Sequence, residues 1–170
     1  MKNLVLIGMP GSGKTCFGKR LARRLRLPLL DTDSMIINKA GKSIPAIFAE
    51  DGEEHFRELE TLCTREASRQ KGAIISTGGG LILRKENMEA LIQNGIIVFI
   101  DRHPSLILRS TSLDDRPLVR DDKDRLFRLY RQRIHLYRSF ADYTLCNTRA
   151  LNGRMSRGVL RILRYYKKHR

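Results

Sequence analysis

The chain has 170 residues, of which 41% are hydrophobic and 30% charged, so it can bury a core and is not a disordered polyelectrolyte. No apolar run approaches the roughly 20 residues that a helix needs to span a bilayer, and the apolar start is too short for a signal sequence. Three scattered cysteines form neither a CxxC pair nor an even disulfide set. These features predict one soluble domain over residues 1–170, in the reducing cytoplasm and away from membranes.

The charge is strongly positive and unevenly placed. The chain carries 33 Lys+Arg against 18 Asp+Glu, a net charge of +15. Residues 1–101 hold 15 basic and 12 acidic side chains, whereas residues 102–170 hold 18 and 6. A basic half is typical of proteins that meet nucleic acid, an anionic membrane or small anionic substrates such as nucleotides. Charge alone leaves these three classes open.

Short apolar runs alternate along the chain with longer stretches whose apolar residues are three and four apart. The short runs predict strands at residues 3–8, 27–30, 73–76, 95–100 and 143–146. The longer stretches predict helices at residues 14–25, 52–69, 85–93, 123–140 and 154–166. Apolar runs without alternation indicate strands buried on both faces, as in a parallel sheet covered by helices. The pattern therefore predicts a three-layer α/β fold with about five parallel strands.

Two segments interrupt this alternation and are predicted to be insertions. Residues 34–71 are almost entirely helical in pattern and lie between two strands. Residues 110–124 are rich in both signs of charge and lack apolar periodicity. We expect the first to be a helical insertion and the second to be a mobile lid.

Residues 8–15 (GMPGSGKT) match the phosphate-loop pattern GxxxxGK[ST], directly after an apolar run and directly before a helical pattern. Glycines let the backbone turn its N–H groups toward phosphate oxygens, and the helix N-terminus adds positive charge. Lys14 is placed to reach the β- and γ-phosphates, and the Thr15 hydroxyl can bind Mg²⁺. A chance Gly-rich turn is the alternative, which the strand–loop–helix context disfavours. The predicted ATP contacts of this loop are Gly11, Ser12, Gly13, Lys14, Thr15 and Cys16.

Two aspartates follow the second predicted strand. If the segment is extended, Asp31 and Asp33 project to the same side, at the carboxyl end of a strand, where open α/β sheets place their sites. One carboxylate could act on the metal and the other could hold or deprotonate an acceptor hydroxyl. The alternative is that Asp33 caps the helical pattern that begins at Ser34.

Two further features have a functional and a structural interpretation. Arg57 and Glu60 are three residues apart on a helical pattern, so the carboxylate can hold the guanidinium, or the two can form an ordinary surface ion pair. Gly78, Gly79 and Gly80 follow the third strand, where they could let a ligand touch backbone N–H groups or could form a flexible turn.

Taken in order, these motifs resemble those of shikimate kinases over about residues 3–147. The matching segments are the phosphate loop, Asp31-Thr32-Asp33, Phe56-Arg57-x-x-Glu60, Thr77-Gly78-Gly79-Gly80, Arg116-Pro117-Leu118 and Arg133-x-x-x-Tyr137-x-x-x-Ala141-Asp142. The resemblance implies a P-loop kinase fold and transfer of the γ-phosphate of ATP to the 3-hydroxyl of shikimate, on the pathway to chorismate and aromatic amino acids.

The resemblance also implies roles for the acceptor side. Asp33 would hold the acceptor hydroxyls and, with Lys14, belong to the catalytic residues. Arg57 and Arg133 would bind the shikimate carboxylate, with backbone contacts from Gly78, Gly79 and Gly80.

For the nucleotide side, the resemblance implies that Arg116 is a catalytic lid residue that closes over the phosphates. Arg109 would stack on adenine, and Arg149 would belong to the adenine loop. Asp31 would act on one Mg²⁺ ion beside Thr15.

Two other functions remain open from the residues alone. The first is another small-molecule kinase of this fold, acting on gluconate or a nucleoside monophosphate. The second is an RNA-associated P-loop ATPase, for which Asp101 would end a metal-binding strand. RNA would then contact the basic stripe of the C-terminal helical pattern, which is made of Arg154, Arg157, Arg161, Arg164 and Lys168. Because few aromatic residues interleave with that stripe, a solvated basic face is favoured. We expect a monomer that binds ATP and shikimate and no nucleic acid.

Overall fold

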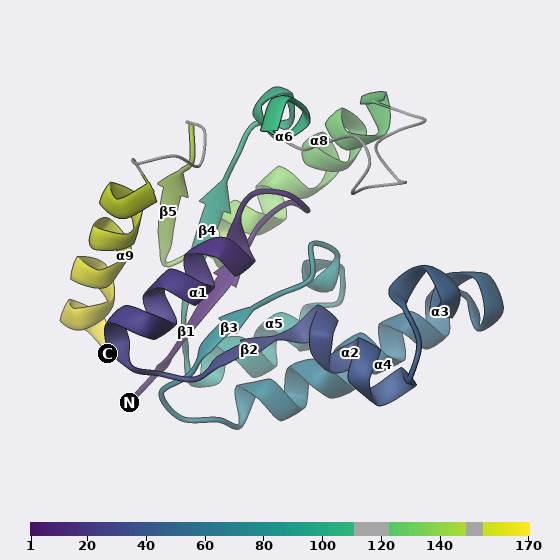
Figure 1. Ribbon diagram of the computed structural model, residues 1–170, viewed down its shortest axis with the longest axis horizontal. Coiled ribbons are helices and arrows are strands. Elements are labelled where there is room, and N and C mark those ends of the chain that lie inside the picture. The colour runs from purple at the N-terminus through teal and green to yellow at the C-terminus, as the bar shows by residue number, and fades with distance from the viewer. Residues whose placement is uncertain (111–122, 149–154) are drawn as a thin grey trace.

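Five strands form one parallel sheet in the computed structural model, which describes residues 1–110, 123–148 and 155–170 (Figure 1). The strands are β1 (Asn3–Ile7), β2 (Leu29–Asp31), β3 (Ile74–Ser76), β4 (Gly95–Asp101) and β5 (Tyr143–Cys146). Their order across the sheet is β2-β3-β1-β4-β5, and every neighbouring pair is parallel. The predicted parallel sheet of about five strands is therefore confirmed.

Helices connect the strands, and most of them follow the predicted pattern closely. They are α1 (Lys14–Leu25), α2 (Thr32–Ala40), α3 (Ile44–Glu50), α4 (Gly52–Ser68), α5 (Lys85–Gln93), α6 (Pro104–Ser110), α8 (Lys123–Phe140) and α9 (Met155–His169), with a 3-10 turn at Leu81–Leu83. None of the helices in the described parts of the chain is long and apolar enough to cross a membrane.

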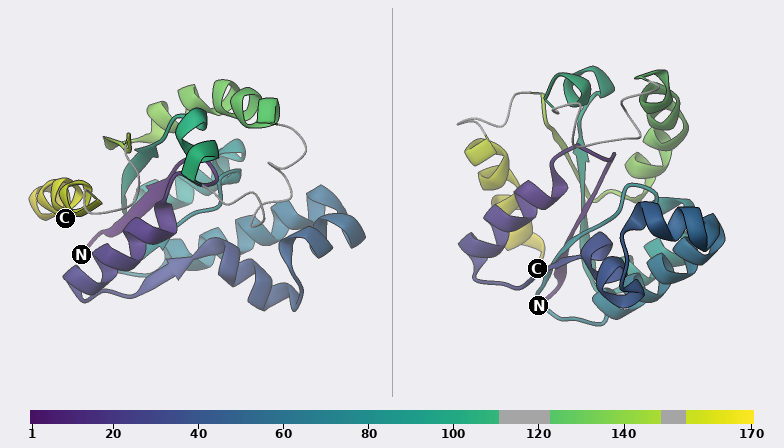
Figure 2. Two further views of the ribbon diagram at one scale, coloured as in Figure 1. Left: turned by 45° about the horizontal axis from the view of Figure 1, so that its top comes forward. Right: turned by 45° about the vertical axis from the view of Figure 1, so that its right-hand side comes forward.

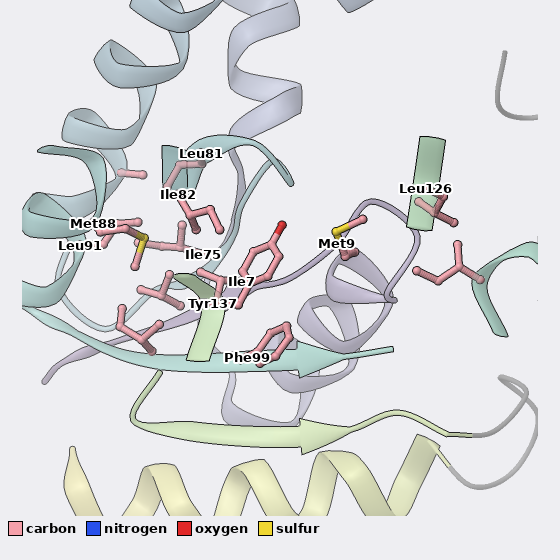
Figure 3. Close-up of a cluster of buried hydrophobic side chains, with 14 residues drawn as sticks. Ile7, Met9, Ile75, Leu81, Ile82, Met88, Leu91, Phe99, Leu126 and Tyr137 are labelled. Carbon is pink, nitrogen blue, oxygen red and sulfur yellow. The ribbon is translucent and has the colours of Figure 1, made fainter. Parts of the chain in front are cut away.

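Side chains that alternate along the central strand feed two separate cores. In β1, Leu4 and Leu6 join the cluster beneath α1 and α9, whereas Val5 and Ile7 join the cluster beneath α4, α5 and α8. The figures show these helix groups on opposite faces of the sheet (Figures 1 and 2). The second cluster, drawn in Figure 3, includes Tyr137. Burial of β1 on both faces explains why its sequence is apolar throughout.

The strand order places a topological switch beside β1. The connection from β1 leads to β2 on one side of it, whereas the connection from β3 leads to β4 on the other side. Ligands of open α/β sheets bind at such a point, where neighbouring connections run in opposite directions. Helices α2, α3 and α4 lie between β2 and β3 in the chain and pack around a small core of their own, made of Ile36, Ile47, Phe56 and Cys63.

The structure contains one helix that the sequence pattern did not predict. Helix α6 was not predicted, although Pro104 at its first position is a typical helix start. The structure places Ser110 at the end of α6 and Lys123 and Asp124 at the start of α8, so the expected 110–124 lid is helical at both borders. Residues 111–122 of that segment lie outside the described residues.

Candidate active site at the carboxyl edge of the sheet

The phosphate loop joins β1 to α1 in a tight turn. Gly13 has a φ of 103°, and Gly8 lies so close to β4 that an added Cβ atom would be 2.6 Å from the carbonyl oxygen of Ile100. Both positions therefore exclude side chains. The buried Lys14 donates hydrogen bonds from Nζ to the carbonyl oxygens of Gly8 and Met9, each at 2.9 Å. These two hydrogen bonds hold the ammonium group of Lys14 over the loop.

A residue far along the chain anchors this loop. Asn147, just after β5, donates from Nδ2 to the carbonyl oxygen of Ser12 at 2.9 Å. Sequence reasoning missed Asn147, although a polar residue directly after a strand at the carboxyl edge was a signal for it.

Oxygen atoms from three elements meet at the start of α1. The Thr15 hydroxyl donates to Oδ2 of Asp31 at 2.9 Å and lies 3.3 Å from the hydroxyl oxygen of Ser76 at the end of β3. Hard oxygen donors of this kind suit Mg²⁺, which uses few protein ligands and keeps water and substrate phosphates in its shell. Within the described residues no group of three or more His, Cys, Asp or Glu side chains could hold a metal ion alone.

The two aspartates lie differently from the sequence expectation. Asp31 ends β2 and accepts a hydrogen bond from the Ser34 N–H at 3.3 Å, so it caps α2. Asp33 is already in the first turn of that helix and is not the cap. The expected extended segment and the alternative cap at Asp33 were both wrong, because the cap lies two residues earlier.

The position of Asp33 changes its acidity. Burial and the nearby Asp31 carboxylate raise the pKa of Asp33, and the cations of Lys14 and Arg57 offset only part of this effect. A carboxylate whose pKa is raised toward the working pH is suited to accept a proton from a hydroxyl group.

Arg57 and Glu60 form the contact that their spacing predicted. Nη1 of Arg57 lies 2.6 Å from Oε2 of Glu60, whose side chain is only 1% exposed, and Glu53 contacts the same guanidinium from outside. Burial tends to lower the pKa of Arg57, but Glu60 and Glu53 outweigh it and raise the pKa. Glu60 is therefore buried and Arg57 is largely buried, so the surface alternative was wrong.

The triple glycine is the point at which the site's side chains converge. A Cβ atom on Gly78 would lie 2.6 Å from Oδ1 of Asp33, and one on Gly80 would lie 2.5 Å from Nη1 of Arg57. A Cβ atom on Gly79 would lie 2.5 Å from Cδ of Pro10 in the phosphate loop. A side chain at Gly79 would clash with the rigid ring of Pro10, and one at Gly78 or Gly80 would displace the side chain of Asp33 or Arg57. The Gly78 N–H also has an internal acceptor, the Thr32 hydroxyl, at 2.9 Å.

Helix α8 contributes two side chains to the same loop. Arg133 donates from Nη1 to the carbonyl oxygen of Gly79 at 3.2 Å, and the hydroxyl group of Tyr137 donates to that oxygen at 2.6 Å. Tyr137 belonged to the family pattern, but sequence reasoning assigned it no role. Arg133 is therefore brought to the loop that Arg57 and Asp33 also touch.

The remaining predicted nucleotide residues are only partly within the described structure. Arg109 is exposed in the last turn of α6, and Cys16 is exposed in the first turn of α1. Arg116 and Arg149 lie outside the described residues.

Asp101, the residue that supports the ATPase alternative, is engaged by other side chains. Its Oδ1 accepts a hydrogen bond from the Tyr130 hydroxyl at 2.9 Å, and Arg138 lies 3.8 Å from Oδ2. Burial and this hydrogen bond raise the pKa of Tyr130 to about 12, so the phenol remains a donor at neutral pH. Asp101 thus has a structural partner in α8.

A phosphate loop at a switch point, facing a carboxylate and a held arginine across a glycine loop, is the arrangement of a P-loop kinase for a small anionic acceptor. The shikimate kinase family model matches residues 10–164. The chain is 40% identical to the shikimate kinase of Clostridium beijerinckii over 152 residues, 89% of each chain. It is 44% identical to that of Caldanaerobacter subterraneus over 148 residues, 85% of this chain and 86% of the relative.

Solved structures agree with these relatives. The shikimate kinase from Acinetobacter baumannii, solved in complex with shikimate, superimposes with a TM-score of 0.89 at 35% identity, covering 98% of this chain and 95% of that one. The enzyme from Bacteroides thetaiotaomicron gives a TM-score of 0.86 at 30% identity, covering 98% of both chains. The chain belongs to the shikimate kinase family.

Proposed function

We propose that the chain transfers the γ-phosphate of ATP to the 3-hydroxyl of shikimate, giving shikimate 3-phosphate and ADP on the way to chorismate and the aromatic amino acids. The observation that carries this proposal is the buried Arg57–Glu60 pair, which touches the same glycine loop as Asp33 and the phosphate loop. A planar guanidinium can bond both oxygens of a carboxylate, which suits an acidic acceptor.

On the donor side, the backbone of residues 11–16 binds the phosphates, and Lys14 neutralises charge that develops on the β- and γ-phosphates. Phosphoryl transfer depends on positioning and electrostatic stabilisation more than on covalent chemistry. We assign the adenine contacts to Arg109 and Arg149. Residues 110–124 act as the lid, and Arg116 is the lid residue that closes over the phosphates. Closure of such a lid excludes water that would otherwise hydrolyse ATP.

On the acceptor side, Arg57 and Arg133 bind the carboxylate, and backbone groups of residues 78–80 line its position. In this orientation the hydroxyl groups of the acceptor face Asp33. Asp33 orients the attacking hydroxyl and accepts its proton, for which its raised pKa is suited.

Thr15 and Asp31 would hold one Mg²⁺ ion, since their oxygen atoms are hydrogen-bonded to each other and are the ligand type that this ion prefers. When bound, the ion would neutralise phosphate charge. We expect EDTA to abolish ADP formation and added Mg²⁺ to restore it.

We propose that the protein acts as a monomer in the cytoplasm and binds no nucleic acid. The basic stripe of α9 is then a solvated surface, because its apolar residues Val159, Ile162 and Tyr166 are buried against the sheet. Light scattering after size exclusion tests the first point, and ATP turnover with and without RNA tests the last.

An acceptor screen tests the activity directly. ADP formation is measured with Mg²⁺·ATP and, in turn, shikimate, gluconate and nucleoside monophosphates, using Lys14→Ala as the matched inactive control. Of the acceptors screened, we expect only shikimate to give rapid turnover. In Lys14→Ala the rate of ADP formation should fall by about 100-fold or more. Equal turnover without any acceptor would support the ATPase alternative, and preference for another acceptor would support a different kinase.

A further inference from the structure

Tyr137 is a fully buried residue whose one polar atom points at the candidate site. Its side chain is 0% exposed, and its ring stacks on Phe99 of β4 with centroids 5.0 Å apart and planes at 11° (Figure 3). Burial raises the pKa of Tyr137, so the phenol keeps its proton. A buried phenol must donate to a partner, and here that partner is the carbonyl oxygen of Gly79 at 2.6 Å.

The Gly79 carbonyl group joins both residues of α8 to the glycine loop. Arg133 and Tyr137 are four residues apart, on one face of the helix, and both donate to this oxygen. The hydroxyl group is the shorter contact, at 2.6 Å against 3.2 Å for the guanidinium. Tyr137 therefore fixes the carbonyl group against which Arg133 is oriented.

The same loop is in close contact with the phosphate loop and with the rest of the acceptor side. Gly79 lies against Pro10, Gly78 against Asp33, and Gly80 against Arg57, each at a distance that leaves no room for a Cβ atom. A displacement of the loop by a few tenths of an ångström would therefore be felt by all three neighbours.

We propose that Tyr137 is a positioning residue for acceptor binding, which holds the Gly79 carbonyl group so that Arg133 and Arg57 meet the same carboxylate. The hydroxyl group acts through the loop and through its own interaction with Arg133, and it does not touch the acceptor. This inference rests on the proposed function, because it concerns the geometry of the acceptor site. Misplacement of binding groups by about 1 Å can reduce activity as much as 100-fold.

A second tyrosine of this chain supplies a matched control. Tyr166 of α9 is also 0% exposed, and its hydroxyl group donates to a backbone carbonyl oxygen, that of Lys2, at 2.5 Å. It lies in the core on the other face of the sheet. Tyr137→Phe and Tyr166→Phe therefore each remove one buried hydrogen bond of the same type and keep the aromatic ring.

The experiment measures kcat, the KM for shikimate, the KM for ATP and thermal unfolding for the wild type and both variants. We expect Tyr137→Phe to raise the KM for shikimate about 10-fold, with the KM for ATP within about 2-fold of the wild type. Tyr166→Phe should leave both KM values unchanged while lowering the melting temperature to a similar extent.

The possible results separate this inference from the proposed function. If the wild type turns over shikimate and the two variants have the same KM for it, Tyr137 has only a structural role and the inference is wrong. The inference is also wrong if Tyr137→Phe raises the KM for ATP as much as that for shikimate. A wild type that forms no ADP in response to shikimate would refute the proposed function itself.

Discussion

The nucleotide side and the acceptor side of the site are built in different ways. The phosphate loop is one continuous segment of eight residues, which its glycines shape and which Asn147 anchors by one hydrogen bond from beyond β5. The acceptor side is assembled from four separated segments, carried by α2, α4, the glycine loop and α8. Its charged residues are paired with one another and partly removed from water.

This difference indicates that the two sides depend on the fold to different extents. A loop that lies in one segment can be recognised from its own sequence, whereas the acceptor side exists only after several separate segments have packed together. Substitutions on the acceptor side should therefore affect stability as well as shikimate binding.

The largest expected effect concerns the acceptor hydroxyl. Asp33→Asn removes the proton acceptor but keeps the size of the side chain, so the rate of phosphoryl transfer should fall by roughly 100- to 10,000-fold. Single-turnover kinetics with bound ATP and shikimate measure this step. Retention of more than half of the wild-type rate would rule out Asp33 as the base.

The second prediction compares a buried ion pair with an exposed one. Glu60→Gln removes the buried negative charge that compensates the largely buried Arg57 and should lower the free energy of unfolding by about 3 kcal/mol. Glu86→Gln, which breaks a pair whose Arg65 and Glu86 side chains are 56% and 44% exposed, should cost less than about 1 kcal/mol. Urea unfolding of both variants tests the contrast, and equal losses would contradict the buried character of the first pair.

The third prediction uses the raised pKa of Asp33. The folded protein holds a proton on this group at pH values where the unfolded chain, with an ordinary value of 3.8, has released it. The resulting contribution to stability is fully present below 3.8 and is lost as the pH rises through the raised pKa. As the pH rises from 3.8 through the raised pKa, Asp33→Asn should therefore become progressively more stable relative to the wild type, measured by chemical unfolding. A constant difference would show that the pKa of Asp33 is not raised.

The smallest expected effect is at Asp101. Asp101→Asn keeps an oxygen atom that can accept the Tyr130 hydrogen bond, so kcat should change less than about 3-fold. An inactive but folded variant would instead favour the ATPase alternative.

The difference between the nucleotide side and the acceptor side also explains how much of the fold and of the site could be predicted from the sequence. The phosphate loop, the parallel sheet and the Arg57–Glu60 contact follow from local spacing, and all three are present. The cap at Asp31 was missed because capping depends on where the helix starts, which periodicity locates only within a few residues. The position of Asn147 after a strand was a local signal, but the partners of Asn147 and Tyr137 are distant in the chain and local patterns do not identify them.

The most direct test of the account is the separation of the two binding sites by Arg57. Arg57→Ala and the control Arg65→Ala, an exposed arginine of the same helix, are titrated with shikimate and with a non-hydrolysable ATP analogue. We expect Arg57→Ala to weaken shikimate binding by about 10- to 150-fold while the affinity for the ATP analogue stays near that of the wild type and of the control. Unchanged shikimate binding, or an equal loss for both ligands, would contradict the assignment of Arg57 to the acceptor carboxylate.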